Sequence, residues 1–358
     1  MSQTKHLLIE SIYQRTIDRT PIWIMRQAGR YLPEYIKTKN QAGGFMKLIR
    51  NPELACEVTM QPLRRYSLDS AILFSDILVV ADMFNMNLRF EDKIGPIFDK
   101  PLRTDSDLKK LPSELDVSNL EYVNETIKNI KGELNDLLPL IGFIGSPWTV
   151  ATYLIEGNST KQFSFVNGML KENPGLLSQI LDMITKGSID YVRQQINNGV
   201  DAIMIFDTWG GLLSGDNYEK FSLNYIQKII SSTYTEGVPV IYYSRSKSNF
   251  DKLKNLDIDC IGISSENNLG DIYKFFDEKL VSTDSNKILN EAHKLKLKIF
   301  ERSKFTSRDY SSDFDVISEV LNDKKIKKKK YDFVVYLQPT SPIRKVSQLT
   351  KALGLVIK

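Results

Sequence analysis

The chain has 358 residues, of which 42% are hydrophobic and 26% are charged, as in a globular protein with a sizeable core. Its net charge of +4 is small for this length, so charge gives no reason to expect nucleic acid or an anionic membrane as a partner. The N-terminal residues lack the apolar segment of a signal peptide, and no stretch is apolar for long enough to span a bilayer. A cytoplasmic protein is therefore expected.

Few imidazole and sulfur groups are present, which limits the chemistry open to the protein. The only histidines are His6 and His293, too few for a histidine-based triad or a multi-histidine metal site. The two cysteines, Cys56 and Cys260, lie in apolar contexts without CxxC spacing, which predicts buried thiols and argues against a zinc site or a disulfide framework. Carboxylates, arginines and hydroxyls must therefore carry any chemistry.

Short apolar runs alternate with longer amphipathic stretches. The runs have the length and composition of buried parallel strands and lie at residues 21–25, 71–75, 140–145, 202–207, 239–244 and 260–265. Amphipathic stretches predict helices at residues 52–66, 117–134 and 174–198, and a hairpin is predicted at residues 88–99. The repeated βα pattern predicts a TIM-type (β/α) barrel.

Polar residues follow several of the predicted strands. Arg26 follows the first strand, Asp76 the second, Ser146 the third, and Asp207 and Thr208 the fourth. Chemistry in such barrels gathers at the carboxyl ends of the strands, so these residues are expected to meet at one rim. The spacing therefore predicts a functional site there.

Two arginines in the segment PIWIMRQAGRYLPEY, residues 21–35, are spaced like a carboxylate clamp. Arg26 and Arg30 are four residues apart, so on a helix both guanidiniums would lie on one face. An isolated pair of this kind is typically a solvated surface feature. The segment, however, resembles the N-terminal signature of the uroporphyrinogen decarboxylases, cofactor-free enzymes of haem biosynthesis that act on uroporphyrinogen, a macrocycle with eight carboxylates. The resemblance implies that Arg26, Gln27 and Arg30 bind substrate, with Arg26 also the favoured proton donor.

Three further motifs carry this resemblance, which covers about residues 5–279. Asp76, in FSDILVV, would bind the pyrrole NH groups and stabilise the cation formed when a pyrrole carbon is protonated. The resemblance implies that Tyr153, in GSPWTVATYLIEG, is a third catalytic residue beside Arg26 and Asp76. Tyr153 and Thr208, in IFDTWGGLLS, would orient the acid arms. From the residues alone, a paired structural aspartate and a core tyrosine with one hydrogen bond remain open, and Asp207 could cap the next helix.

The resemblance implies a carboxy-lyase that removes four acetate carboxylates from uroporphyrinogen III to give coproporphyrinogen III, without a metal or organic cofactor, and commonly as a homodimer. Only six strands are predicted, whereas a closed barrel needs eight. The family's late strand and late histidine have no counterpart, since His293 lies in a different sequence context. The expected fold is thus a TIM-type barrel lacking its last two strands, and an inactive protein that binds tetrapyrroles is the alternative.

The sequence changes character near residue 280, which predicts two domains, 1–279 and 280–358. The second resembles the middle of the acylneuraminate (CMP-sialic acid) cytidylyltransferases, Rossmann-like α/β nucleotidyltransferases. In the motif LQPTSPIR, four residues match the loop beside the nucleotide: Gln338, Thr340, Ser341 and Arg344. The family's triphosphate-binding loop has no counterpart, so a nucleotide-binding remnant of a gene fusion is expected. A CTP-dependent sialic acid cytidylyltransferase is the third hypothesis.

Overall fold

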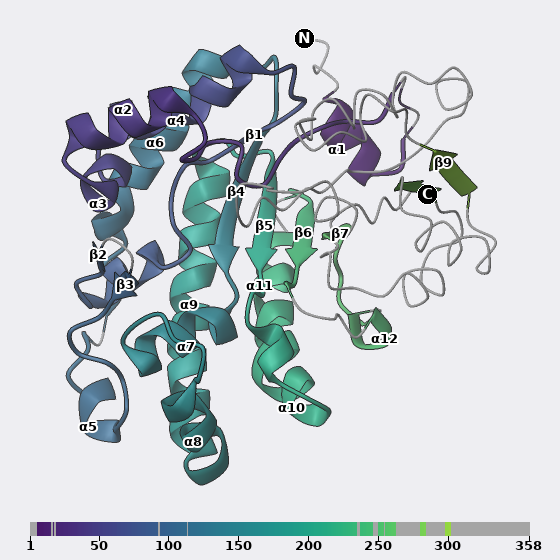
Figure 1. Ribbon diagram of the computed structural model, residues 1–358. Helices are drawn as coiled ribbons and strands as arrows, with labels where there is room; N and C mark the ends of the chain where they lie inside the picture. The colour runs from purple at the N-terminus through teal and green to yellow at the C-terminus, as the bar shows by residue number, and fades with distance from the viewer. Residues whose placement is uncertain are drawn as a thin grey trace.

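A computed structural model describes residues 6–15, 17, 19–91, 94–112, 114–234, 237–245, 250–253 and 255–262, with two further strands at 280–283 and 298–301. A parallel sheet lies at its centre with helices packed against it (Figure 1). Within the described residues this sheet has the order β1-β4-β5-β6-β7. Its strands are β1 (Ala71–Ile72), β4 (Leu140–Gly145), β5 (Ala202–Phe206), β6 (Val240–Tyr243) and β7 (Cys260–Gly262).

The register of the sheet brings several strand ends to one level. All its strand pairs are parallel. The last paired residues are Gly145 with Phe206 between β4 and β5, and Phe206 with Tyr243 between β5 and β6. The amide of Ser146 donates to the carbonyl of Phe206 at 2.9 Å, and the amide of Asp207 donates to that of Tyr243 at 2.7 Å. The segments after these three strands therefore leave the sheet side by side, and the arrowheads in Figure 1 point to the same end.

Helices of the βα repeat surround the sheet. The longer ones are α2 (Pro33–Ala42), α4 (Pro52–Arg65), α6 (Glu121–Leu134), α7 (Pro147–Glu156), α8 (Ser164–Glu172), α9 (Pro174–Asn197) and α11 (Asn224–Tyr234). Helix α4 packs on α6, and α9 packs on α7 and α11. Shorter helices are α1 (Leu7–Ile12), α3 (Phe45–Ile49), α5 (Asp105–Leu108), α10 (Asp216–Tyr218) and α12 (Phe250–Leu253).

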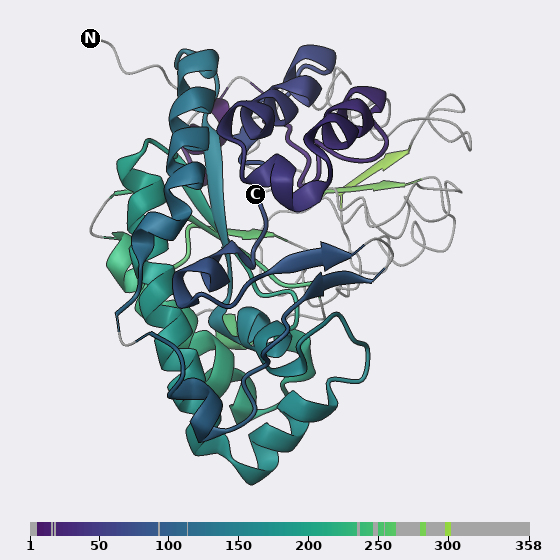
Figure 2. The same cartoon turned by 90° about the vertical axis from the view of Figure 1, so that its left-hand side faces the viewer.

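Irregular turns and a hairpin complete the described part. The 3₁₀ turns are η1 (Val79–Phe84), η2 (Val117–Leu120) and η3 (Gly210–Leu212), and η4 (Glu219–Leu223) is a π-helical turn. Strands β2 (Arg89–Glu91) and β3 (Gly95–Ile97) pair antiparallel, which confirms the predicted hairpin. In Figure 2 this hairpin, in dark blue, projects away from the long helices α6 and α9.

A glutamine on α9 is hydrogen-bonded to β4, the strand between β1 and β5 in the sheet. All six residues of β4 are buried, so each of its backbone groups needs a partner. Strand β1 pairs only with Leu140 and Ile141 of β4. Further along β4, the side chain of Gln195 bonds both backbone groups of Phe143: its Oε1 accepts from the amide at 2.9 Å and its Nε2 donates to the carbonyl at 3.0 Å. Gly142 makes room for this contact, because a Cβ there would lie 2.4 Å from Oε1 of Gln195.

Two local predictions were wrong. The apolar run at 21–25 forms a single bridge residue, Ile22, and not a strand. Arg26 and Arg30 do not lie on a helix, since residues 25–31 form turns and bends and α2 begins only at Pro33. Proline disfavours the helical region for the residue before it, and Leu32 is accordingly extended, with φ −89° and ψ 119°. The helix therefore starts after the arginines.

The described part of residues 263–358 consists of β8 (Leu280–Thr283) and β9 (Lys298–Glu301), which pair in parallel. His293, Gln338, Thr340, Ser341 and Arg344 lie outside the described residues. The fold is thus a parallel α/β architecture of the TIM type over the region of the main sheet. Among the helices described, none has the length and apolar character to cross a membrane.

Candidate active site

Asp76 lies beyond β1, at the carboxyl end of the sheet. Its Oδ1 accepts a hydrogen bond of 2.9 Å from the amide of Leu78 at the start of η1. Burial raises the pKa of this carboxyl to about 6, against the opposing effects of the Leu78 amide and the positive charge of Arg26. At neutral pH the group is therefore ionised, but it is held in an environment that disfavours its charge.

Arg26 and Tyr153 share this environment with Asp76. Arg26 is exposed on the turn before α2, and its charge lowers the pKa of both Asp76 and Tyr153. Burial raises the pKa of Tyr153, on α7, and the carboxylate of Asp76 raises it further. Three predicted catalytic residues from three separate segments therefore lie within electrostatic reach of one another.

Of the two residues predicted to assist Arg26, Arg30 is exposed as Arg26 is, whereas Gln27 is buried. Arg30 is exposed, and its charge opposes the burial that raises the pKa of Tyr35 on α2. Gln27 is only 1% exposed: its Nε2 donates to the carbonyl of Ser70 at 3.1 Å and its Oε1 accepts from the amide of Ile24 at 3.4 Å. The side chain of Gln27 thus anchors the arginine turn to the segment before β1, and its amide is turned into the protein.

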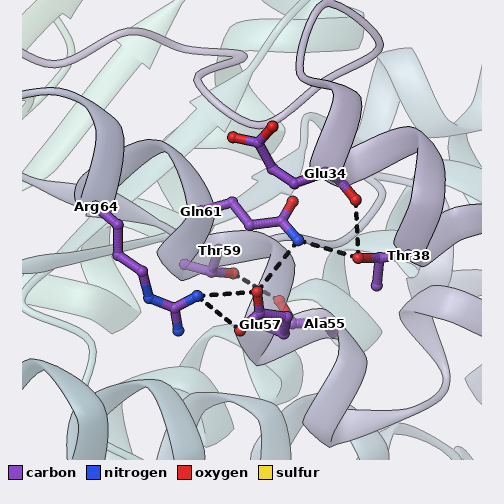
Figure 3. Close-up of polar contacts among 7 residues, drawn as sticks. All are labelled: Glu34, Thr38, Ala55, Glu57, Thr59, Gln61 and Arg64. Atoms are coloured by element: carbon purple, nitrogen blue, oxygen red, sulfur yellow. Dashed lines mark hydrogen bonds and ion pairs between the residues drawn. The ribbon is translucent and has the colours of Figure 1, made fainter.

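A polar network joins α2 to α4 (Figure 3). The Nε2 of buried Gln61 on α4 donates to Oγ1 of Thr38 on α2 at 3.0 Å and to Oε1 of Glu57 at 3.3 Å. Thr59, also on α4, accepts from the amide of Phe74 at 3.2 Å. Helix α4 is therefore bonded both to the helix after the arginines and to the segment that leads into Asp76.

Asp207 is a fully buried carboxylate at the end of β5. Its Oδ1 accepts from the hydroxyl of Ser146 at 2.6 Å, and its Oδ2 accepts from those of Ser222 at 3.0 Å and Tyr242 at 2.9 Å. Burial raises the pKa of Asp207 and these hydroxyls oppose the rise. Both carboxylate oxygens of Asp207 accept hydrogen bonds from other side chains of the protein. Asp207 is therefore a structural group that joins the ends of β4 and β5 to β6 and η4.

The segment after Asp207 is bonded to the first turn of α7. The amide of Trp209 donates to Oγ1 of Thr149 at 3.2 Å, and Nε1 of Trp148 donates to the carbonyl of Trp209 at 2.9 Å. Thr208 is partly buried and lies in the sequence between Asp207 and Trp209. The helix that carries Tyr153 and the loop that carries Thr208 are therefore held together.

Comparison with known proteins identifies the family to which this site belongs. The profile of Uroporphyrinogen decarboxylase (URO-D) matches residues 3–286. The chain belongs to the uroporphyrinogen decarboxylase family. It is 46% identical to the uroporphyrinogen decarboxylase of Hydrogenovibrio crunogenus, over 74% of this chain and 76% of that protein. It is 45% identical to the uroporphyrinogen decarboxylase of Alkalilimnicola ehrlichii, over 74% of this chain and 73% of that protein.

A solved structure confirms the fold of this uroporphyrinogen decarboxylase family member at a lower level of similarity. A methyltransferase from Methanosarcina mazei aligns over 96% of both chains with a TM-score of 0.60 and 19% identity. At that identity the likeness concerns the fold alone. Within the described residues, no three His, Cys, Asp or Glu side chains gather in a way that could hold a metal ion.

One feature of the family member's site was missed in the sequence. The indole of Trp209 packs edge-on against Phe163, with ring centroids 4.8 Å apart, and lies 6.5 Å from the ring of Tyr153. The guanidinium carbon of Arg245 lies 5.9 Å from the centre of the Trp209 ring. Arg245 comes two residues after β6, so the rule that selected Arg26 and Asp76, a polar residue after a predicted strand, could have found it.

Proposed function

We propose that this chain decarboxylates uroporphyrinogen III, converting its four acetate arms to methyl groups to give coproporphyrinogen III. One observation carries the proposal: in a member of this family, Arg26, Asp76 and Tyr153 lie within electrostatic reach of one another. Arg26 is an exposed guanidinium, and Asp76 is a carboxylate whose pKa is raised. An anionic substrate suits the guanidinium, and a cationic intermediate suits the carboxylate. No step requires a metal or an organic cofactor.

Decarboxylation of an acetate arm needs a place for the electron pair of the breaking C–C bond. Arg26 binds an acid arm and delivers a proton to the adjacent pyrrole carbon, and solvent later restores that proton. The protonated ring is a cation that accepts the electron pair as carbon dioxide leaves. Reprotonation of the arm then gives a methyl group, and loss of the ring proton restores the pyrrole.

Asp76 stabilises this cation electrostatically and accepts hydrogen bonds from the pyrrole NH groups. Burial strengthens the effect, because a fixed charge acts more strongly where little water screens it. Arg30 adds a carboxylate contact, and Tyr153 and Thr208 orient the remaining arms. Gln27 contributes by holding the arginine turn, since its side chain bonds to backbone groups.

Replacement of Arg26 by alanine tests the proposal. We expect kcat/KM for uroporphyrinogen III to fall at least a hundredfold, since both a charge-assisted carboxylate contact and the proton donor are lost. The matched control is Arg193→Ala, at another exposed arginine near the end of α9 that leads into β5, which should change turnover little. Equal turnover by the Arg26→Ala and Arg193→Ala proteins would exclude the proposed role.

Two further inferences concern the state of the protein. We infer a homodimer, as is common in the family, which light scattering would detect as twice the chain mass of 41.0 kDa. An inactive tetrapyrrole binder is the competing function, and it predicts porphyrin binding without any product of lower carboxylate number. Turnover by the purified chain excludes it.

For residues 280–358 we propose a fragment derived from a cytidylyltransferase that has no transfer activity of its own. The motif LQPTSPIR supports the origin, and the lack of a phosphate-binding loop upstream supports the inactivity. Incubation with CTP, a sialic acid and saturating Mg²⁺ should release no pyrophosphate. Release at an enzymatic rate would overturn this proposal and favour the nucleotidyltransferase.

A further inference from the structure

Tyr153 lies in the last turn of α7, where a helix has carbonyls without partners of its own. Helix ends fray when such groups stay unpaired. Here the carbonyl of Tyr153 accepts from the amide of Gly157 at 2.8 Å, and that of Leu154 accepts from the amide of Leu102 at 2.9 Å. The carbonyl of Gly157 accepts from the amide of Phe98 at 2.7 Å. The segment that follows the hairpin therefore runs along the end of α7 and bonds to it.

Arg103, in this segment, bonds the last two carbonyls of α7. Its Nε donates to the carbonyl of Ile155 at 3.1 Å and its Nη2 to that of Glu156 at 3.0 Å. The guanidinium carbon lies 3.4 Å from the ring centre of Phe165, in the first turn of α8, so the face of the group is stacked while its edge donates. The amide of Arg103 donates to Oδ2 of Asp107 on α5 at 3.3 Å. A cation held at a helix C-terminus in this way also favours the helix dipole.

The side chain of Tyr153 meets groups that belong to other segments. Its ring lies 6.5 Å from that of Trp209, which packs edge-on against Phe163 just before α8. The charge of Asp76 raises the pKa of its hydroxyl and that of Arg26 lowers it. Asp76 follows β1 and Arg26 lies on the turn before α2, so neither is carried by α7. A shift of the last turn of α7 would therefore move Tyr153 relative to both.

We propose that Arg103 is a positioning residue for the reaction: by capping the last turn of α7, it fixes the hydroxyl of Tyr153 relative to Asp76 and Arg26. Arg103 bonds only to groups of the protein in this role and acts through Tyr153. A lysine would keep the charge at the helix end, but it lacks the fork that reaches both carbonyls and the plane that stacks on Phe165. For the role of Tyr153 in turnover, this inference rests on the proposed function.

A double-mutant cycle on the full-length chain tests whether Arg103 acts through Tyr153. We expect Arg103→Ala to lower kcat about tenfold or more, because a small misplacement of a catalytic group is costly. In the Tyr153→Phe protein, which has no hydroxyl to position, the same change should lower kcat less than twofold. Arg103→Lys should recover part of the loss.

The matched control is Lys131→Ala, which removes another partly buried cation. Lys131 pairs with Asp201 at 2.9 Å, and Asp201 accepts from the amide of Leu140, so this pair lies at the amino ends of β4 and β5. Lys131→Ala should lower the melting temperature and leave kcat within twofold of that of the unsubstituted chain.

Fluorine NMR of the chain labelled with 3-fluorotyrosine reports on Tyr153 without turnover. The signal of Tyr153 is the one lost in the Tyr153→Phe protein. We expect Arg103→Ala to shift and broaden this signal, because the ring moves relative to Trp209 and to the two charges. Lys131→Ala should leave it in place.

The outcomes separate this inference from the proposed function. An unchanged Tyr153 signal in Arg103→Ala would overturn the inference, whether or not the chain turns over uroporphyrinogen III. An equal fold-loss of kcat with and without the Tyr153 hydroxyl would also overturn it. If the unsubstituted chain has no turnover and Arg103→Ala shifts the signal, the decarboxylase proposal fails and the positioning of Tyr153 stands. Should Arg103→Ala not melt cooperatively, Arg103→Lys takes its place, with a smaller shift expected and an unchanged signal again contradicting the inference.

Discussion

Replacement of Asp76 by asparagine should remove activity and at the same time stabilise the fold. Burial raises the pKa of Asp76 from its ordinary 3.8 to about 6. At ~1.4 kcal/mol for each unit of pKa, ionisation of this carboxyl costs the folded state about 3 kcal/mol more than the unfolded state. Asparagine removes the charge, and its Oδ1 can still accept the hydrogen bond from the Leu78 amide.

The pH dependence of this gain follows from the direction of the shift. A group whose pKa is higher in the folded state costs nothing below its unfolded pKa, where both states are protonated. The cost grows as pH rises from 3.8 and is complete above about 6. The Asp76→Asn protein should therefore exceed the unsubstituted chain in free energy of unfolding by about 3 kcal/mol at pH 8, but by only about 1 kcal/mol at pH 4.5.

Urea denaturation at the two pH values measures the stability difference, and anaerobic turnover of uroporphyrinogen III measures activity. We expect kcat to fall about a hundredfold or more, the usual result of removing one preorganised electrostatic group. A variant less stable than the unsubstituted chain at pH 8 would refute the burial cost. Full turnover by Asp76→Asn would refute the role of the carboxylate in catalysis.

Three further predictions concern pH and the groups that hold the site. The kcat/KM of the unsubstituted chain should fall tenfold per pH unit below about pH 6, where Asp76 becomes protonated, and a flat profile from pH 5 to 8 would contradict this. Asp207→Ala should cost about 3 kcal/mol or more in urea denaturation, because it leaves three buried hydroxyls without their acceptor, whereas Asp207→Asn should cost less. Gly142→Ala should cost about 3 kcal/mol, since its Cβ would lie 2.4 Å from Oε1 of Gln195. Gly132→Ala, with nothing within 4 Å and on an exposed helix face, should be neutral or slightly stabilising in the same measurement.

The buried centre of the fold could be predicted well from the sequence. Strand β4 has the predicted ends, and β5, β6, α4 and α9 differ from prediction by one residue at one or both ends. These elements are long apolar runs or strongly amphipathic stretches, so local pattern and tertiary environment favour the same structure. The run at 21–25 was misassigned because a short apolar segment can be buried without forming a strand.

The difference between Asp76 and Asp207 could not be predicted in the same way. Both follow an apolar run that ends a predicted strand, in FSD and IFD, and both have a pKa raised by burial. Only the fold shows that Asp207 accepts hydrogen bonds from three hydroxyls of distant segments, whereas Asp76 lies within electrostatic reach of Arg26 and Tyr153. Such partners depend on tertiary contacts, which local sequence patterns do not encode.

Anaerobic turnover of uroporphyrinogen III by the purified full-length chain tests the proposed function most directly. Products are resolved by carboxylate number, and a thermal melt of the same sample shows that the protein is folded. We predict stepwise loss from eight to four carboxylates by a protein that melts cooperatively. A cooperative melt with the octacarboxylate unchanged would contradict the assignment of Arg26, Asp76 and Tyr153 to catalysis in this chain.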